Sequence, residues 1–423
     1  MRPVPAIPQR KLIALALPNM AARTESGGGG GSDGTGSGGA SDGTGGAGGG
    51  GASRGASGPP SLRARVVEVA RLFGWLGVIG VGGPAAHIAM MRTRVVRQCG
   101  WVSDDEFARI VGACALVPGP NSTEMAMALG AKRAGWRGLL VGGASFIVPA
   151  FLIVCAIGWV YEDVLTSATI ADIRRWAVPI VAAIVLDALW KLRSTAVRDV
   201  RDAVIAALAL AGTVVGVPEL LVLAIVGAGS VALRARTAPG TTMRAVATPF
   251  VAVASAAATT VPLWHIFLVF LQIGSVIYGS GYVLLVFLDA EVVGRGWISP
   301  DVLLDAISVG QFTPGPVFTT ATFIGWHLAG FGGAAVATLG IFGPSFVFAA
   351  LVDRVVRWSQ RSQVFGAFLR GVSTGSIALM VVVLVRLADE AFVDGWAIAT
   401  FVVSLAVILA VPWWRAARRA RVG

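Results

Sequence analysis

Two segments of the sequence place hydrogen-bonding side chains directly after a Pro-Gly-Pro triplet, inside otherwise apolar sequence. Proline removes a backbone donor and clashes with the preceding helical turn, so each triplet predicts a broken helix. We call Pro118–Pro120 the first break and Pro314–Pro316 the second break. The polar residues that follow are Asn121, Ser122, Thr123 and Glu124 after the first break, and Thr319 and Thr320 after the second.

The overall composition is that of a protein embedded in a lipid bilayer. Hydrophobic residues make up 55% of the chain and charged residues 13%, with a mean hydropathy of +0.76. Soluble domains carry about 25% charged residues. Apolar stretches of about 20 residues, enough to span a bilayer as a helix, recur along the chain. These features predict an all-α polytopic membrane protein.

Broken helices carry a specific meaning in that setting. Irregular backbone is tolerated inside a bilayer only where protein or a water-filled cavity covers it. Two matched breaks in corresponding halves of a membrane protein are typical of a transporter's binding site. The two breaks therefore predict where a substrate is held.

Charge and residue usage exclude several other classes of function. The net charge of +11 arises from basic residues scattered between the apolar stretches, which set membrane orientation, and we expect no nucleic-acid partner. The sequence contains no Gly-Lys-Ser/Thr phosphate loop, and its three cysteines and three histidines are dispersed. It therefore indicates no metal site, no cofactor and no enzyme. His87 is expected to be packed or bonded to backbone.

The two halves of the chain match each other when the breaks are aligned. Corresponding residues lie 195 to 197 positions apart and keep one order, which indicates duplication. The matching pairs include Gly77 with Gly274, Gly100–Ser103 with Gly296–Ser299, and Pro149 with Pro344.

This alignment predicts the domain organisation. Residues 1–60 are expected to form a disordered Gly/Ser-rich tail because they offer little to bury. Residues 61–235 form the first repeat, residues 236–263 a linker that includes a marginal extra span, and residues 264–423 the second repeat. Each broken segment, 105–131 and 301–327, is expected to cross the bilayer with its break near the midplane.

The repeats are predicted to be inverted. About twelve spans of bilayer length place the second repeat seven spans after the first, and an odd offset reverses its orientation. Loop charge agrees, because Lys132 and Arg133 follow the first broken segment while the matching loop at Ala329 is uncharged. Arg92 and Arg94 would then face outward, which the same rule disfavours.

Four motifs resemble the chromate ion transporter family, over both halves of the chain from about residue 65. They are "GGPAAHIAMM" (Gly82–Met91), "PGPNSTEMA" (Pro118–Ala126), "GSGYVLL" (Gly279–Leu285) and "GQFTPGPVFTTATFIG" (Gly310–Gly325). The resemblance implies a bacterial inner-membrane protein that exports chromate and confers chromate resistance, with sulfate as a competitor. A transporter or channel for sulfate or another oxyanion is the alternative. Whether the chain acts as a homodimer is left open.

For an oxyanion, the breaks supply suitable donors. The first N–H groups of each half-helix are unpaired and carry partial positive charge, and Gly119 and Gly315 permit close backbone approach. The predicted substrate-binding residues are Gly119, Asn121, Ser122, Thr123, Gly315, Thr319 and Thr320. Arg92, Lys132 and Arg133, with Arg94 and Arg137 nearby, are candidates for an anion vestibule or simple topology anchors.

Glu124 has two competing interpretations. An intramembrane carboxylate indicates proton coupling. The spacing Asn121-x-x-Glu124 also fits a capping box, in which the glutamate accepts a hydrogen bond from the N-cap amide. Since an inside-negative potential favours exit of an anion, both passive export and proton exchange remain open.

Overall fold

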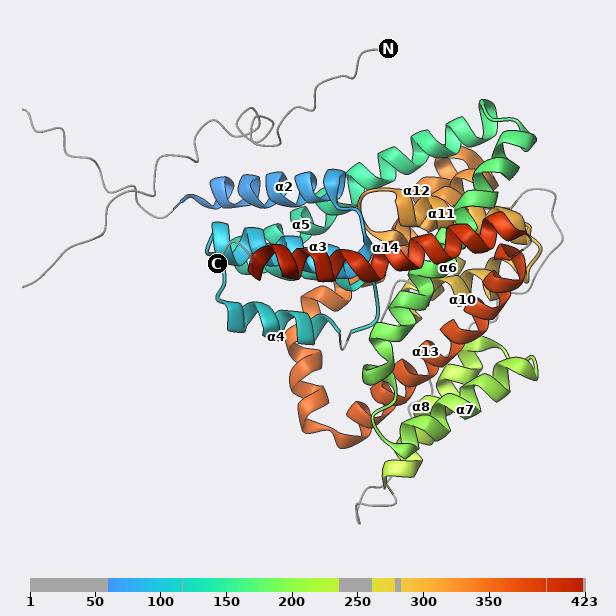
Figure 1. The fold of residues 1–423 in the computed structure, drawn as a ribbon. Coiled ribbons are helices and arrows are strands. Elements are labelled where there is room, and N and C mark those ends of the chain that lie inside the picture. The colour runs from blue at the N-terminus through green and yellow to red at the C-terminus, as the bar shows by residue number, and fades with distance from the viewer. Residues whose placement is uncertain (1–59, 116, 236–260, 278–282, 393, 421–423) are drawn as a thin grey trace, which may run out of the picture. The chain divides into compact units, whose positions relative to one another are not determined.

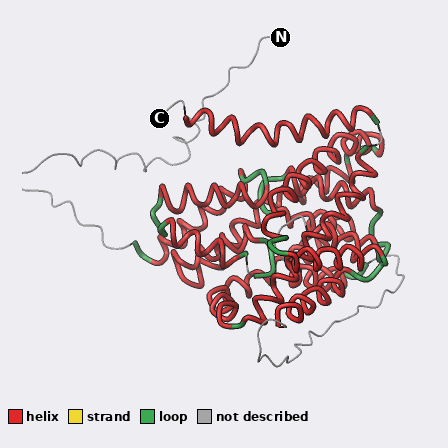
Figure 2. The backbone as a smooth tube through the Cα atoms, turned by 60° about the horizontal axis from the view of Figure 1, so that its bottom comes forward, coloured by secondary structure: helices red, strands yellow, loops and turns green. Residues whose placement is uncertain are grey.

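The computed structural model describes residues 60–115, 117–235, 261–277, 283–392 and 394–420. These residues belong to one unit, residues 58–423, and form helices joined by short connections (Figures 1 and 2). The predicted tail, most of the linker with its marginal extra span, and residues 279–282 of the third motif lie outside the described residues.

The helices of the first half are α2 (Leu62–Ile79), α3 (Gly83–Met91), η1 (Arg92–Gln98), α4 (Asp104–Cys114), α5 (Asn121–Asp163), α6 (Ser167–Ala196), α7 (Val200–Val214) and α8 (Glu219–Ala235). Those of the second half are α9 (Leu263–Val276), α10 (Leu284–Leu288), η2 (Asp289–Val293), α11 (Pro300–Phe312), η3 (Val317–Thr319), α12 (Thr320–Arg361), α13 (Gln363–Ala391) and α14 (Gly395–Ala420).

Matching residues start matching helices in the two halves. The hydroxyl group of Ser103 accepts a hydrogen bond from the N–H of Glu106 and so caps α4. Ser299 caps α11 in the same way, through the N–H of Val302. The last residue of the repeated Gly-Trp-Val/Ile-Ser sequence is therefore an N-cap in both halves.

The segment 105–131 does not cross the protein as one span, which corrects the sequence-based expectation. Lys132, near the end of the first part of α5, forms an ion pair of 3.1 Å with Glu106 near the start of α4. A collinear arrangement would separate these residues by more than the two helices' combined length of about 30 Å. Residues 121–133 therefore fold back along α4, and the first break is the tip of a hairpin.

The segment 301–327 folds back in the same manner. Asp305 near the start of α11 accepts a hydrogen bond of 2.7 Å from Tyr161, and His327 contacts the neighbouring Glu162 at 3.0 Å. Both arms of this second hairpin thus end beside the carboxyl end of α5. Hydropathy alone could not distinguish a hairpin from a span, because both are apolar over the same length.

Each hairpin is joined to a long helix by a sharp reversal that only glycine fits. In α5 the reversal falls at Ala134 and Gly135, where Gly135 has φ 63° and ψ −151°. A Cβ on Gly138 would overlap the carbonyl oxygen of Gly130, and one on Gly142 would lie 2.6 Å from that of Ala126. A continuous helix would hold residues 126 and 142 about 24 Å apart, so the two parts of α5 lie side by side.

The same reversal occurs in α12. Gly330 has φ 56° and ψ −148°, and a Cβ on Gly325 would overlap the carbonyl oxygen of Gly333. Thr322 and Thr338 are hydrogen-bonded at 2.8 Å across this contact. Small residues let the backbones approach closely, as they do between membrane helices.

Packing between helices follows a paired pattern. Helix α2 packs on α5 as α9 packs on α12, and α14 packs on α6 as α7 packs on α13. Helices α5 and α12 contact each other, as do α6 and α13. In these pairs, each helix thus meets the partner that its counterpart meets in the other half, whereas the contact of α8 with α13 has no equivalent.

The long helices are suited to a bilayer. Among the described residues, three helical stretches contain an apolar part long enough to cross a membrane: Asn121–Asp163, Val317–Val352 and Gln363–Asp389. Large apolar side chains are also exposed on the outer surfaces of the helices, including Trp136, Trp159, Trp190 and Trp396. The chain is an all-α polytopic membrane protein.

We predict that Gly138→Ala destabilises the fold by about 1–3 kcal/mol, the usual cost of overpacking. The added methyl group must displace the backbone of Gly130. Gly343→Ala is the matched control, because a Cβ there meets nothing within 4 Å and alanine favours a helix. Thermal unfolding in detergent measures both, and equal melting temperatures would contradict the close hairpin packing.

Candidate functional site

The two breaks are locked to the opposite halves of the chain by matching hydrogen bonds. Gly119 in the first break donates its N–H to the carbonyl oxygen of Ile277, at 2.8 Å. Gly315 in the second break donates its N–H to the carbonyl oxygen of Gly80, at 2.7 Å. Gly80 is the C-cap residue of α2 and Ile277 is the C-cap residue of α9, the first described helix of each half. Four interrupted helices therefore meet at two corresponding points.

Both central glycines are required by this geometry. Gly119 has φ 131° and Gly315 has φ 101°, in the region that favours glycine. A Cβ on Gly119 would overlap a carboxylate oxygen of Glu124 and lie 2.9 Å from the hydroxyl group of Ser345. A Cβ on Gly315 would overlap the Cβ of Ala150.

The predicted donors are brought to the breaks, but several already have partners. The hydroxyl group of Thr319 donates to the carbonyl oxygen of Pro316, and that of Thr320 donates to Val317, both at 2.9 Å. Because the N–H groups of Gly119 and Gly315 are also used, an oxyanion must displace existing hydrogen bonds to reach them.

After the first break the polar residues are enclosed. Ser122 and Thr123 are buried, and within the described residues the hydroxyl oxygen of Thr123 has no hydrogen-bond partner. Asn121 is the first residue of α5 and is partly buried. Within the described residues, Thr123 thus brings a buried hydroxyl group without a partner to the first break.

The capping interpretation of Glu124 is wrong. The N-cap of α5 is Pro120, which has no N–H to donate, and the helix has no side-chain cap. Glu124 is 1% exposed, and neither carboxylate oxygen has a hydrogen-bond partner among the described residues. The hydroxyl oxygen of the neighbouring Ser345 also has no hydrogen-bond partner among the described residues. Such groups are costly to bury and therefore require a functional explanation.

His87 is bonded to the backbone, as expected. Its Nε2 donates to the carbonyl oxygen of Gly80 at 2.9 Å, and its ring packs edge-on against Phe146. That carbonyl oxygen also accepts the N–H of Gly315. His87 therefore helps to hold the point at which α2 meets the second break.

The vestibule candidates are paired with carboxylates. Arg92 contacts Asp104 at 2.8 Å, Lys132 contacts Glu106, and Arg133 contacts Glu68 at 2.6 Å. Arg94 lies over the ring of Trp75 and Arg137 over that of Trp136. These pairs reduce the positive potential that the sequence implies at this end of the hairpin.

A charged cluster near the start of α11 and the carboxyl end of α5 was not identified from the sequence. Arg174 in α6 forms two hydrogen bonds with Asp305, at 2.8 and 2.6 Å, and an ion pair of 2.6 Å with Asp301. The hydroxyl group of Tyr161 donates a hydrogen bond to Asp305. The sequence signals are Asp305, an acidic residue inside the apolar segment 301–327, and the adjacent pair Arg174 and Arg175 before an apolar run; neither signal predicts the pairing.

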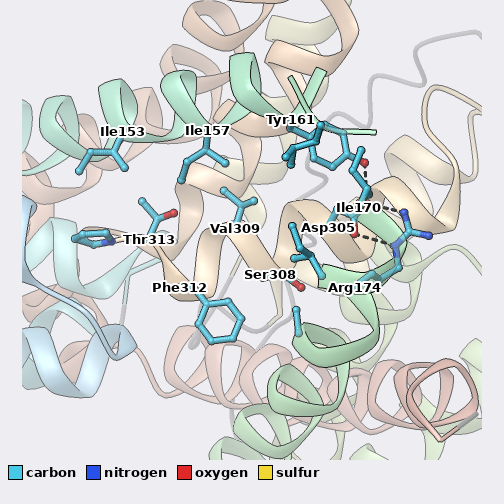
Figure 3. A pocket seen from close by; sticks show the side chains of 14 residues that line it. Ile153, Ile157, Tyr161, Ile170, Arg174, Asp305, Ser308, Val309, Phe312 and Thr313 are labelled. Carbon is cyan, nitrogen blue, oxygen red and sulfur yellow. Dashed lines mark hydrogen bonds and ion pairs between the residues drawn. The ribbon is translucent and has the colours of Figure 1, made fainter. Parts of the chain in front are cut away.

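This cluster closes one end of a cavity of about 270 Å³ (Figure 3). Its walls come from α5, α6 and α11, and its other end reaches Thr313 and Pro314 of the second break. Apolar side chains such as Ile157 and Val309 line the space between. The cavity thus connects the Arg174 cluster to a predicted binding segment.

The long apolar helices and the broken, interlocked segments define a multi-pass membrane protein. The chain belongs to the chromate transporter family, whose pattern it matches twice, over residues 67–233 and 264–418. It is 30% identical to a probable chromate transport protein of Synechococcus elongatus, over 75% of this chain and 84% of that protein. It is also 30% identical to the chromate transport protein of Pseudomonas aeruginosa, over 78% and 81%.

The chromate transport protein of Cupriavidus metallidurans is 28% identical over 77% of this chain and 84% of that protein. No solved structure significantly matches the chain. The relatives are named transporters, and nothing in these matches indicates a catalytic activity.

We predict that Glu124→Met raises the free energy of unfolding by about 1–3 kcal/mol, because it removes a buried carboxyl group that lacks partners. Asp202→Asn is the control: Asp202 is equally buried but paired with Arg234, so its replacement should lower stability by about 3 kcal/mol. Thermal unfolding in detergent measures both. A loss of stability in Glu124→Met would show that Glu124 has a structural partner.

Proposed function

We propose that this chain exports chromate across the bacterial inner membrane and thereby confers chromate resistance. The observation that carries this proposal is the double match to the chromate transporter family. Relatives that are named as chromate transport proteins also align with the chain over most of their length. Transport of sulfate or another oxyanion is the alternative, because a site for a tetrahedral dianion recognises shape and charge.

The breaks form one shared oxyanion site in this proposal. Its donors are the backbone and side chains of Gly119, Asn121, Ser122 and Thr123 from the first half and of Gly315, Thr319 and Thr320 from the second. Support comes from the cross-bonds at Gly119 and Gly315, which tie each break to the opposite half. An oxyanion that takes over these N–H groups would loosen that connection, so binding and rearrangement are coupled.

Membrane voltage favours export. Moving one charge across 100 mV is worth about 2.3 kcal/mol, so a dianion leaving an inside-negative cell gains about 4.6 kcal/mol. Uptake of the same dianion would need a coupled cation. Passive exit is therefore sufficient, and a proton gradient could add to it.

Glu124 is the residue through which protons would act. A carboxylate beside a bound oxyanion repels it, whereas a protonated carboxyl group can donate a hydrogen bond to it. The absence of partners for Glu124 within the described residues supports this role. With Glu124→Gln, export should persist but lose its dependence on the proton gradient; retained dependence would remove Glu124 from the coupling mechanism.

The repeats are inverted in this proposal. At the end of the first hairpin, Arg133 forms an ion pair with Glu68 and Lys132 forms one with Glu106. The second ends beside Tyr161 and Glu162, at the far end of the 28-residue helix that follows Gly135. That helix, residues 136–163, is about 42 Å long, enough to cross a bilayer. Hairpins that start from opposite ends of one such helix support an inverted arrangement.

We predict that Arg133→Cys and Ala329→Cys are labelled from opposite sides of the membrane. The test uses a background without Cys99, Cys114 and Cys155 and an impermeant maleimide on intact cells and on inverted vesicles. Labelling of both positions from one side would rule out the inverted arrangement.

We predict that expression in a chromate-sensitive bacterium lowers cellular chromium and raises chromate tolerance. Inverted vesicles should take up labelled chromate saturably, with sulfate, molybdate and phosphate as competitors, and saturation separates a carrier from a channel. Gly315→Ala should abolish this flux, since its methyl group overlaps Ala150. Gly296→Ala is its control, with a φ of 72° and no atom within 4 Å. Unchanged chromium in cells that carry the protein in their membrane would count against chromate.

A further inference from the structure

The Arg174 cluster lies at one end of the cavity that reaches the second break. Arg174, Asp305 and Tyr161 line one end of the cavity, and Thr313 and Pro314 line the other. The side chain of Asp305 is 8% exposed and that of Arg174 is 21% exposed. Figure 3 shows Asp305 bound both by the guanidinium group of Arg174 and by the hydroxyl group of Tyr161, beside the apolar lining. An ion pair at this place controls the charge of the cavity.

The cluster as it stands repels anions. One guanidinium group faces two carboxylates, since Asp301 also contacts Arg174. A dianion would meet excess negative charge in a space walled by apolar side chains, where screening is weak. Occupation by an oxyanion therefore requires Arg174 to be released from Asp305.

The geometry of the pair matches what an oxyanion would use. The Nε and one terminal nitrogen of Arg174 bind the two oxygens of Asp305 as a parallel pair. A guanidinium group binds two oxygens of a tetrahedral oxyanion through the same fork. Asp305 and an oxyanion are thus alternative ligands for one group of donors.

We propose that this cavity is an oxyanion-binding chamber next to the second break, in which Asp305 and the oxyanion compete for the guanidinium group of Arg174. The inference rests on the proposed transport function and adds to it a specific residue and a gate. While Asp305 holds Arg174, the chamber excludes anions. When an oxyanion takes its place, α6 and α11 keep only the ion pair between Arg174 and the more exposed Asp301, and the chamber opens beside the second break.

The gate belongs to one half of the chain only. At the separation of 196 residues that relates Gly119 to Gly315, Asp305 corresponds to Arg109 and Arg174 corresponds to Arg370. Both counterparts are exposed cations, so the first half cannot form the same acid–base pair. The two halves of the chain would therefore interact differently with anions.

A purely structural role for the pair makes a different prediction. If Arg174 and Asp305 only fasten α6 to α11, removing both charges together leaves no buried unpaired charge and should be tolerated. Anion binding would then be unaffected. The double variant Arg174→Gln/Asp305→Asn separates the two roles, because it should fold in either case.

The experiment measures how chromate and sulfate raise the melting temperature of the full-length protein in detergent, and how flux saturates in proteoliposomes. Asp305→Asn removes the competing carboxylate and should lower the half-saturating anion concentration about tenfold, or about 1.4 kcal/mol. Arg174→Gln/Asp305→Asn should raise it at least tenfold. Arg174→Lys, which keeps the charge but loses the fork, should fall between the double variant and the wild type.

Arg234→Gln/Asp202→Asn is the matched control, because this pair is similarly enclosed but lies between α7 and α8. It should leave the half-saturating concentration unchanged. The proposal is overturned if the double variant at Arg174 binds and transports anions as the wild type does, or if Asp305→Asn fails to strengthen binding.

These outcomes separate the gate from the proposed function. A wild type that exports chromate while all Arg174 and Asp305 variants saturate normally would refute the gate alone. A wild type that responds to sulfate, molybdate or phosphate but not to chromate would refute the substrate assignment, and the same variants would then test the gate with that anion. A wild type that responds to none of them would refute both.

Discussion

The fold depends on satisfying the backbone of helices that stop inside the protein. Each break leaves polar backbone groups where no solvent is available, and such groups are costly unless they are paired. The N–H of Gly119 meets the carbonyl oxygen of Ile277, and the N–H of Gly315 meets that of Gly80. Because each half supplies what the other lacks, neither half of the chain could bury its broken helices alone.

In the proposed oxyanion site, these same bonds would limit how tightly a substrate is held. A net hydrogen bond contributes about 1 kcal/mol, and an oxyanion that takes over the glycine N–H groups must replace bonds of that size. The net gain on binding is therefore smaller than the number of donors suggests. A modest gain suits a carrier, which has to release its substrate on the other side.

Local chemistry made part of this architecture predictable. Pro-Gly-Pro triplets break helices through their own geometry, and Ser103 and Ser299 cap helices through bonds to residues three positions on, so breaks and helix starts could be read from the sequence. The direction of the chain after each break could not, because a hairpin and a span have the same hydropathy. The pairing of Arg174 with Asp305 joins residues 131 positions apart, and no periodicity encodes it.

The scaffold is paired between the halves, but its titratable and charged groups are not. Glu124 corresponds to Thr320, and Asp305 corresponds to Arg109. The glycines, prolines and caps that shape the backbone are kept in both halves. An unpartnered carboxyl group adjoins the first break, whereas a largely enclosed ion pair lies across the cavity from the second break. Under the proposed inverted arrangement, such a scaffold would allow both sides of the membrane to reach one site by equivalent motions. Membrane voltage sets the direction of net flux, whereas the residues that differ determine how each half responds to the charge of the anion.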